Sequence, residues 1–326
     1  RIQNSELAMT VVEAIERSNG KTVFTFEILP REKGADIKSI YDHIDPLMEF
    51  DPKFIEVTYH REEVKFREYP DGRIEKKVLR KRPGTVGISA AIKYKYKVEV
   101  IPHIICGGFT KEETENGLID LHFLGIQNVL AVRGDNLPGD KFFRPTKGGH
   151  VYTSDLIRQV INLNRGVYLD EEIQNVHPTN FSIGVAGYPE KHVESPNMQT
   201  DIKFLKEKVD AGADYIVTQM FFDNSKYFEF VDLCRKAGIN VPIIPGLKPI
   251  STKKQLSTLP KTFNISIPEP LQKEIDRCSD NEEARRVGIE WAIEQSKELA
   301  AKGAPVLHYY TMGRSDNIWE IASAVF

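Results

Sequence analysis

Residues 22–30 read Thr-Val-Phe-Thr-Phe-Glu-Ile-Leu-Pro, and this stretch decides the fold. Its aromatic and β-branched residues predict a strand over 22–28. In a doubly wound open sheet that binds a dinucleotide, a glycine-rich turn follows the first strand. Here Glu27, Ile28, Leu29 and Pro30 stand in that place, and no G-x-G-x-x-G motif occurs in the chain. The stretch therefore favours a barrel over the doubly wound alternative.

Short apolar runs alternate with longer helical patterns along the whole chain. The runs predict strands at 22–28, 54–58, 98–104, 128–132, 182–186, 215–219, 243–246 and 305–309. Helical patterns between them include 111–124, 154–162, 200–211, 226–237 and 281–301. Most runs are continuously apolar, as strands covered on both faces by helices should be. Eight such units predict an α/β fold, a (β/α)₈ TIM-type barrel, as a single domain over residues 1–326.

The bulk composition is that of an ordinary soluble protein. The 326 residues are 40% hydrophobic and 28% charged, with a formal net charge of −3, which gives no reason to expect a nucleic-acid partner. The three cysteines are too few and too scattered for a disulfide framework, and no apolar run reaches the ~20 residues of a membrane helix. We expect a cytoplasmic protein. Residues 1–20 suggest an amphipathic helix, and the basic run at 76–82 suggests the solvated face of another helix.

The active site of such a barrel lies at the carboxyl ends of its strands. Glu27 ends the first strand among apolar neighbours, which predicts partial desolvation and a pKa raised toward neutrality, so that it could act as a general acid. The alternative is a glutamate paired with a lysine or arginine at the rim. Arg133, Gly134 and Asp135 end the fourth strand, where a cation, a permissive backbone and a carboxylate suit a ligand, or else a loop closed by a structural salt bridge.

Other polar residues at strand ends carry weaker signals. His103 and Cys106 form H-x-x-C without a second pair, so we expect no metal site. Gln219 offers an amide donor and acceptor to a heterocycle, or is purely structural. His192 could bind a phosphate or cap a helix. From the residues alone, the chain is a barrel enzyme with an acid, an Arg/Asp pair and groups suited to a large heterocyclic ligand.

Six motifs resemble the methylenetetrahydrofolate reductase family in order and spacing. They are TFEILP at 25–30, LAVRGD at 130–135, VAGYPEKH at 185–192, DAGADYIVTQMFFD at 210–223, IPGLKPI at 244–250 and HYYTMGR at 308–314. The resemblance runs from about residue 22 to residue 314, and it is to the catalytic barrel without the C-terminal regulatory domain of longer eukaryotic members. It implies an FAD-containing (β/α)₈ barrel that works in one-carbon metabolism and methionine supply.

The resemblance implies ping-pong chemistry. NADH or NADPH reduces the flavin and leaves, and methylenetetrahydrofolate then takes the hydride on its one-carbon unit. Glu27 matches the general acid that helps open the folate's five-membered ring to an iminium ion. Asp135 matches the aspartate that tunes the flavin and stabilises the cationic intermediate. Dimers or tetramers are common in the family, so a homo-oligomer is expected.

Further site residues carry over by position. Those that match FAD-binding positions, or stand beside one, are Thr58, His103, Val132, Arg133, Gly134, Asp135, Tyr152, Thr153, Tyr188, His192, Asp201 and Lys208. Those that match or flank substrate-contacting positions are Glu27, Gln219, Tyr310 and Arg314, of which Arg314 suits the carboxylate-bearing tail of the folate.

Three departures limit the transfer. Phe204 stands where a bacterial relative has an asparagine, Gly313 replaces a bulkier polar residue, and residues 251–254 lack the aromatic that stacks on the nicotinamide. The last departure allows an alternative, in which a partner protein supplies the electrons. A second alternative is a non-catalytic subunit that binds folate or flavin, against which the set of Glu27, Asp135 and Gln219 argues.

Overall fold

The computed structural model of the protein describes residues 9–137, 140 and 142–326. Its parallel strands form one sheet in the order β10-β11-β1-β2-β5-β6-β7-β8-β9. Only Pro245 separates β9 from β10, and its carbonyl accepts a hydrogen bond from the backbone N–H of His308 at 3.1 Å. Proline has no N–H for the sheet, so β9 and β10 are the two halves of one interrupted strand. The ring thus closes as the predicted (β/α)₈ barrel. The strands of the ring are β1 (Val23–Ile28), β2 (Phe54–Val57), β5 (Glu99–Ile105), β6 (Asn128–Val132), β7 (Ser182–Gly187), β8 (Tyr215–Thr218), β9 (Ile243–Ile244), β10 (Gly246–Leu247) and β11 (Val306–Tyr310).

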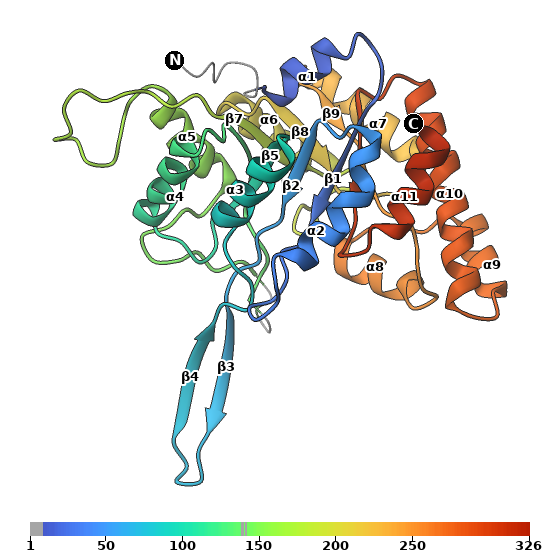
Figure 1. Cartoon of the computed structure of the whole chain (residues 1–326), viewed down its shortest axis with the longest axis horizontal. Helices are drawn as coiled ribbons and strands as arrows, with labels where there is room; N and C mark the ends of the chain where they lie inside the picture. Colours follow the sequence, from blue (N-terminus) through green and yellow to red (C-terminus); the bar gives the residue numbers. More distant parts are fainter. Residues whose placement is uncertain (1–8, 138–139, 141) are drawn as a thin grey trace.

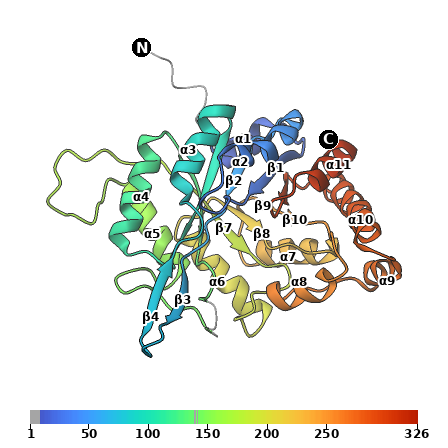
Figure 2. The same ribbon diagram turned by 60° about the horizontal axis from the view of Figure 1, so that its bottom comes forward.

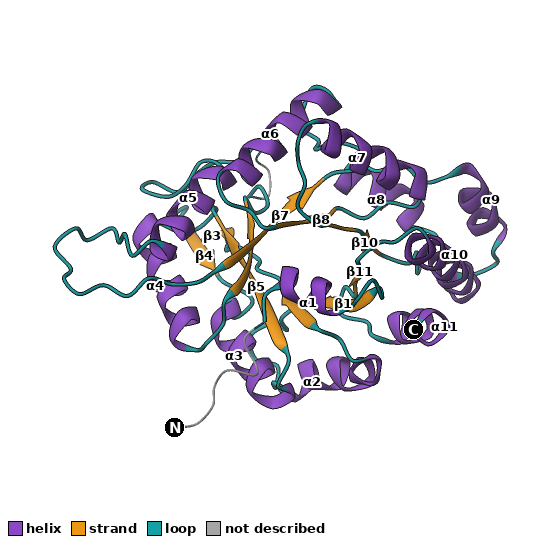
Figure 3. Cartoon of the chain, turned by 90° about the horizontal axis from the view of Figure 1, so that it is seen from above, coloured by secondary structure: helices purple, strands orange, loops and turns teal. Residues whose placement is uncertain are grey.

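Helices surround the strands on the outside, as the view from above shows (Figure 3). They begin at caps that the sequence supplies, such as the capping box that Thr110 and Glu113 form at the start of α4. The helices are α1 (Val11–Arg17), α2 (Lys38–Ile44), the 3₁₀ helix η1 (Asp45–Phe50), α3 (Thr85–Tyr96), α4 (Lys111–Phe123), α5 (Thr153–Asn164), α6 (Met198–Asp210), α7 (Asn224–Lys236), α8 (Gln255–Phe263), α9 (Glu269–Arg277), α10 (Asn281–Ala301) and α11 (Asp316–Val325). No helix in the described residues is both long and apolar enough to span a bilayer.

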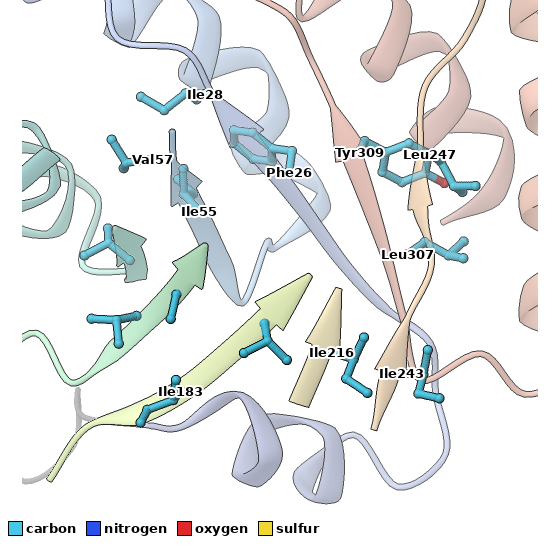
Figure 4. Close-up of a cluster of buried hydrophobic side chains, with 14 of the residues drawn as sticks. Phe26, Ile28, Ile55, Val57, Ile183, Ile216, Ile243, Leu247, Leu307 and Tyr309 are labelled. Carbon is cyan, nitrogen blue, oxygen red and sulfur yellow. The ribbon is translucent and has the colours of Figure 1, made fainter. Parts of the chain in front are cut away.

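Alternate side chains of each strand point outward and pack under the helices. Phe26, Ile55, Ile216 and Leu307 belong to this outer core and are at most 2% exposed (Figure 4). Burial of one such side chain contributes roughly 1.5–3 kcal/mol, so the outer layer accounts for much of the stability of the fold. The same period of two sends the intervening residues into the barrel.

The lower half of the barrel interior is apolar and is closed by a helical plug. Val23, Phe54, Ile244 and Val306 form one buried cluster with Val11 and Ala14 of α1, and α1 lies across the centre of the ring (Figure 3). A helix with an apolar face covers the barrel floor in the way a core helix covers a sheet. The interior is therefore a packed core, and a ligand can enter only from the other end.

One hydrogen-bonding residue fastens the plug. Asn128, at the start of β6, accepts from the backbone N–H of Val11 at 3.2 Å and donates to the carbonyl of Met9 at 2.9 Å. Of the predicted N-terminal helix, the described residues form α1 at Val11–Arg17, and the predicted residues 1–8 lie outside the described part.

The prediction of a helix around the basic run 76–82 is wrong. Residues Ile74–Leu79 form β4, which pairs antiparallel with β3 (Glu63–Glu68). The two strands project from the barrel as a hairpin (Figures 1 and 2). The turn explains the difference, because Gly72 adopts φ +80° and donates its N–H to Tyr69 at 2.9 Å. Such a turn reverses the chain within a few residues and pairs the flanking segments before a helix can form.

Candidate active site

Inward-facing polar side chains form a layer above the apolar floor of the barrel. Glu56 of β2 lies 2.9 Å from Nε2 of His103 on β5 and 3.7 Å from Nε2 of His308 on β11. Thr25 of β1 contacts Nδ1 of His308 at 3.1 Å. Burial by itself would raise the pKa of the Glu56 carboxyl, but the two histidines outweigh burial and hold it below its usual value. This layer is a preformed charge network. It lies at the bottom of the mouth, by which we mean the open end of the barrel at the carboxyl ends of the strands.

Glu27 is the acid that stands free beside this network, level with Glu56. It is 7% exposed, and neither an ion pair nor a hydrogen bond to another described residue holds its carboxyl group. Burial raises the pKa of Glu27 well above the ordinary value, and the charge of Glu56 raises it further. The alternative of a rim glutamate in a salt bridge does not fit this environment. A buried acid kept protonated near neutral pH is suited to proton donation.

Lys248 is the cation whose charge acts on Glu27, and it lowers the pKa of that carboxyl against the effects of burial and Glu56. It follows β10, continues the inward alternation of Ile244 and Gly246, and is 5% exposed. Its ammonium donates to the carbonyl of Pro249 at 3.3 Å. Burial lowers the pKa of Lys248 to about 8, and the charges of Lys248 and Glu27 favour each other's ionised form. The mouth thus places one ammonium near the Glu27 carboxyl.

Tyr310 and Gln219 line the same mouth on the inward faces of their strands. Tyr310 donates its hydroxyl to the carbonyl of Thr218 at 2.5 Å. Gly246 makes room for this contact, since a Cβ there would lie 2.4 Å from the Tyr310 hydroxyl. The side-chain oxygen of Gln219 accepts from the N–H of Met220 at 2.9 Å, which leaves its amide N–H groups for a ligand.

The Arg133-Gly134-Asp135 turn lies at the next part of the rim. Gly134 has φ +86°, a conformation that glycine adopts without strain. Arg133 forms a bidentate ion pair with Glu194 at 2.7 and 2.8 Å and stacks on Phe143 at 5.0 Å. The structural salt bridge considered as the alternative therefore exists, and Arg133 must exchange Glu194 for a ligand anion in order to bind one. Asp135 is exposed at the surface.

Four predicted cofactor residues, Tyr188, His192, Asp201 and Lys208, lie near one another after β7. Tyr188 and His192 pack edge to face with ring centroids 4.7 Å apart. Asp201 accepts from the N–H of His192 at 3.0 Å and from the hydroxyl of Ser195 at 2.7 Å, which fixes this loop on α6. Lys208 donates to the carbonyl of Ala186 at 2.6 Å, and burial lowers its pKa to about 8.

The remaining predicted residues make separate contacts. Thr58 donates to the carbonyl of Ile28 at 3.2 Å, and Val132 ends β6. Tyr152 is 64% exposed beside Thr153, the first residue of α5. Arg314 is exposed and pairs with Asp316 at 2.7 Å. The structure thus brings together a mouth group around Glu27 and a cationic group around Arg133, and it leaves Arg314 outside both.

Two departures from the family pattern have structural counterparts. Phe204 is 49% exposed on α6, where it makes a poor partner for a polar group. Lys253 donates its ammonium to the carbonyls of Asp276, at 3.2 Å, and Cys278. The loop at 251–254 is therefore tied to the end of α9 and presents no aromatic ring.

Sequence reasoning missed Glu56, His308 and Lys248. The signal that could have found them is the period of two within each strand. Counted from the inward-facing Val23, Phe54, Ile244 and Val306, each missed residue falls at an even spacing and so points inward. Inward polar residues next to the mouth are therefore candidate site residues in the same way as those at the strand ends.

Comparisons with known proteins agree with this geometry. The family model for methylenetetrahydrofolate reductase matches residues 11–325. The 5,10-methylenetetrahydrofolate reductase of Escherichia coli is 32% identical over 310 residues, which cover 95% of this chain and 92% of that protein. Methylenetetrahydrofolate reductase (NADH) 1 of Arabidopsis thaliana is 33% identical over 316 residues. The match covers 93% of this chain but 48% of the plant protein, so the chain spans about half the length of such relatives.

A solved structure supports the fold alone. It is a Clostridium thermocellum protein that binds two copies of 5-methyl-5,6,7,8-tetrahydrofolic acid, with a TM-score of 0.55 and 16% identity over 95% of this chain and 98% of that one. The barrel, the match of the family model over nearly the whole chain, and the identity to the Escherichia coli protein lead to one assignment. The chain belongs to the methylenetetrahydrofolate reductase family.

Proposed function

We propose that this chain reduces 5,10-methylenetetrahydrofolate to 5-methyltetrahydrofolate with FAD as cofactor. The observation that carries the proposal is Glu27, a buried and unpaired acid whose pKa is raised, at the open end of a barrel of this family. A binding module needs no positioned acid, and this disfavours the non-catalytic alternative.

The residues of the rim suit FAD by their chemistry. Arg133, Lys208 and His192 provide cationic or hydrogen-bonding groups for its phosphates, and Tyr188 provides a ring for stacking. Lys208 and Arg133 lie close enough that the charge of Arg133 lowers the pKa of the lysine. Two cations held near each other are favourable for a diphosphate. When bound, FAD would supply hydride transfer between the electron donor and the folate.

The chain's own residues would supply position and a proton. Glu27, protonated through its raised pKa, would donate its proton to a nitrogen of the folate's five-membered ring as that ring opens. Asp135 would place its negative charge beside the cation that results. Gln219 would hold the pterin through its free amide N–H groups, with Tyr310 beside it. Arg314 would have to exchange Asp316 for a carboxylate of the folate tail.

The electron donor in this proposal is NADH or NADPH in a ping-pong sequence. One observation favours a second candidate, in which a partner protein delivers the electrons. The loop at 251–254 offers no aromatic ring, and Lys253 is held by two backbone carbonyls. A nicotinamide would therefore need another stacking partner in the mouth.

An anaerobic visible spectrum tests both candidates. The flavin of the purified protein should bleach with NADH or NADPH and regain its colour with methylenetetrahydrofolate. A flavin that resists both nicotinamides, yet reoxidises with folate after chemical reduction, would favour a partner protein. A colourless protein that cannot be reconstituted with FAD would contradict the proposal.

A further inference from the structure

The hairpin that follows β2 is a projection that no other helix or strand of the described residues covers. We call residues 61–82 the arm. At its base, Arg80 stacks on Tyr59 at 5.7 Å, and Lys81 pairs with Glu63 at 2.8 Å. At its tip, the ring of Tyr69 lies between two guanidinium groups, and its hydroxyl donates to Glu75 at 2.7 Å. The arm thus makes internal contacts at its tip and packs on Tyr59 at its base, and it extends from the mouth side of the barrel, opposite α1 (Figure 1).

One face of the arm is mostly apolar. The antiparallel register pairs Val64 with Val78, Phe66 with Lys76, and Glu68 with Ile74. These six residues share a face, because residues directly opposite each other across an antiparallel pair point the same way. Phe66 is 70% exposed, Ile74 is 67% exposed and Val78 is 54% exposed. We call Val64, Phe66, Ile74 and Val78 the apolar stripe.

A partner that covered the apolar stripe would stabilise the arm. A two-stranded hairpin alone is at best marginally stable in water, and both of its edges present unpaired backbone groups. Contiguous exposed apolar residues with a polar border mark interaction surfaces. The face of the arm that carries the stripe combines its four apolar residues with two polar ones, Glu68 and Lys76.

The charges indicate which partner fits. Glu68 and Lys76 form no ion pair within the part of the chain that the structure describes. A face with one acid and one base is neutral, so two identical faces can meet without like-charge repulsion, each acid near the other copy's base.

We propose that the arm is a self-association surface, on which the apolar stripe packs against the stripe of a second copy of this chain. The opposite face of the arm is left in solvent, since it carries Lys65, Arg67 and Lys77 beside acidic residues. An isologous contact of this kind uses the same patch on both copies and closes on itself, which avoids the growth of fibres from a bare strand edge.

Light scattering after size exclusion tests this surface. The wild-type protein should show at least twice the chain mass of 37.1 kDa. The double variant Phe66→Glu, Ile74→Glu should lose association and show a lower mass. The control is Lys65→Glu with Lys77→Glu, a cross-strand pair on the other face. It changes the charge by more than the test variant does, and it should keep the wild-type mass.

Two further variants test the contact without placing a charge on the apolar stripe. Glu68→Lys should weaken association through like-charge repulsion, and the exchange Glu68→Lys with Lys76→Glu should restore it. Phe66→Cys should give a cross-linked dimer with a short bis-maleimide, whereas Lys65→Cys should not. The three native cysteines are buried and should not compete. A monomeric wild type, or a mass unchanged by the stripe variants, would overturn the proposal.

Discussion

Glu27 and Glu56 are register partners on neighbouring strands, so two buried carboxyls share one level of the barrel. Their environments shift the pKa values of the two carboxyls in opposite directions. The histidines hold Glu56 ionised by lowering its pKa, and the resulting charge helps to raise the pKa of Glu27. Two interacting carboxyls with opposite shifts are the usual way in which one site keeps both an acid and an anion at neutral pH.

Glu27→Gln should abolish the proton donation that we assign to this residue. We expect folate reduction to fall by at least ~100-fold, the scale of general-acid removal, while flavin reduction by the nicotinamide changes little. Stopped-flow measurement of the two half-reactions separates these outcomes. The variant should be at least as stable as the wild type at neutral pH, since an acid with a raised pKa costs stability as pH rises above its unfolded value. Folate reduction at the wild-type rate would show that the acid lies elsewhere.

Lys248→Met should move the pH profile of folate reduction to higher pH. The active form of Glu27 is the protonated one, so activity is lost as pH rises through its pKa. Lys248 opposes the rise of that pKa, and its removal should therefore shift the loss of activity upward. Lys254→Met, which removes an exposed ammonium near the start of α8, should leave the profile in place. An unchanged profile in Lys248→Met would remove the lysine from the acid's environment.

Glu194→Ala should tighten FAD binding. The carboxylate of Glu194 competes with a phosphate for the guanidinium of Arg133, and a partly exposed ion pair of this kind is worth about 1 kcal/mol or less. We therefore expect the dissociation constant to fall by no more than about fivefold, as measured by flavin fluorescence on titration of the apoprotein. Glu171→Ala, an exposed acid in the segment between α5 and β7, is the control. Weaker binding would instead mean that Glu194 orients Arg133 for the cofactor.

Asn128→Ala should loosen the plug at the barrel floor. The variant leaves the N–H of Val11 and the carbonyl of Met9 without their partner, and an unsatisfied buried group costs about 1–3 kcal/mol. Urea unfolding should show this loss, and proteolysis near the N-terminus should accelerate. Asn162→Ala, at an exposed position of α5, should change the stability by less than about 0.5 kcal/mol. Equal effects of the two variants would argue against the plug.

The sequence by itself determined the barrel and the location of its mouth. Periods of two and of 3.6 residues are local, so the alternation of strand and helix can be predicted without knowledge of any contact. The rule that parallel barrels carry their sites at the strand ends then pointed to Glu27 and Gln219, which the structure places in one mouth. The interrupted strand at Pro245 and the short helix α1 altered only the boundaries of elements.

Tertiary structure decided which of these residues are paired. His308 reaches Glu56 only because the barrel pairs β11 with β1, which brings residues from opposite ends of the chain together. Arg133 finds Glu194 across two loops, and the arm replaces an expected helix because its turn pairs two strands away from any core. Pairing, burial and the pKa shifts that follow from them depend on distances between segments that are remote in sequence. Local periodicity fixes the direction of a side chain, whereas only the closed barrel fixes what that side chain meets.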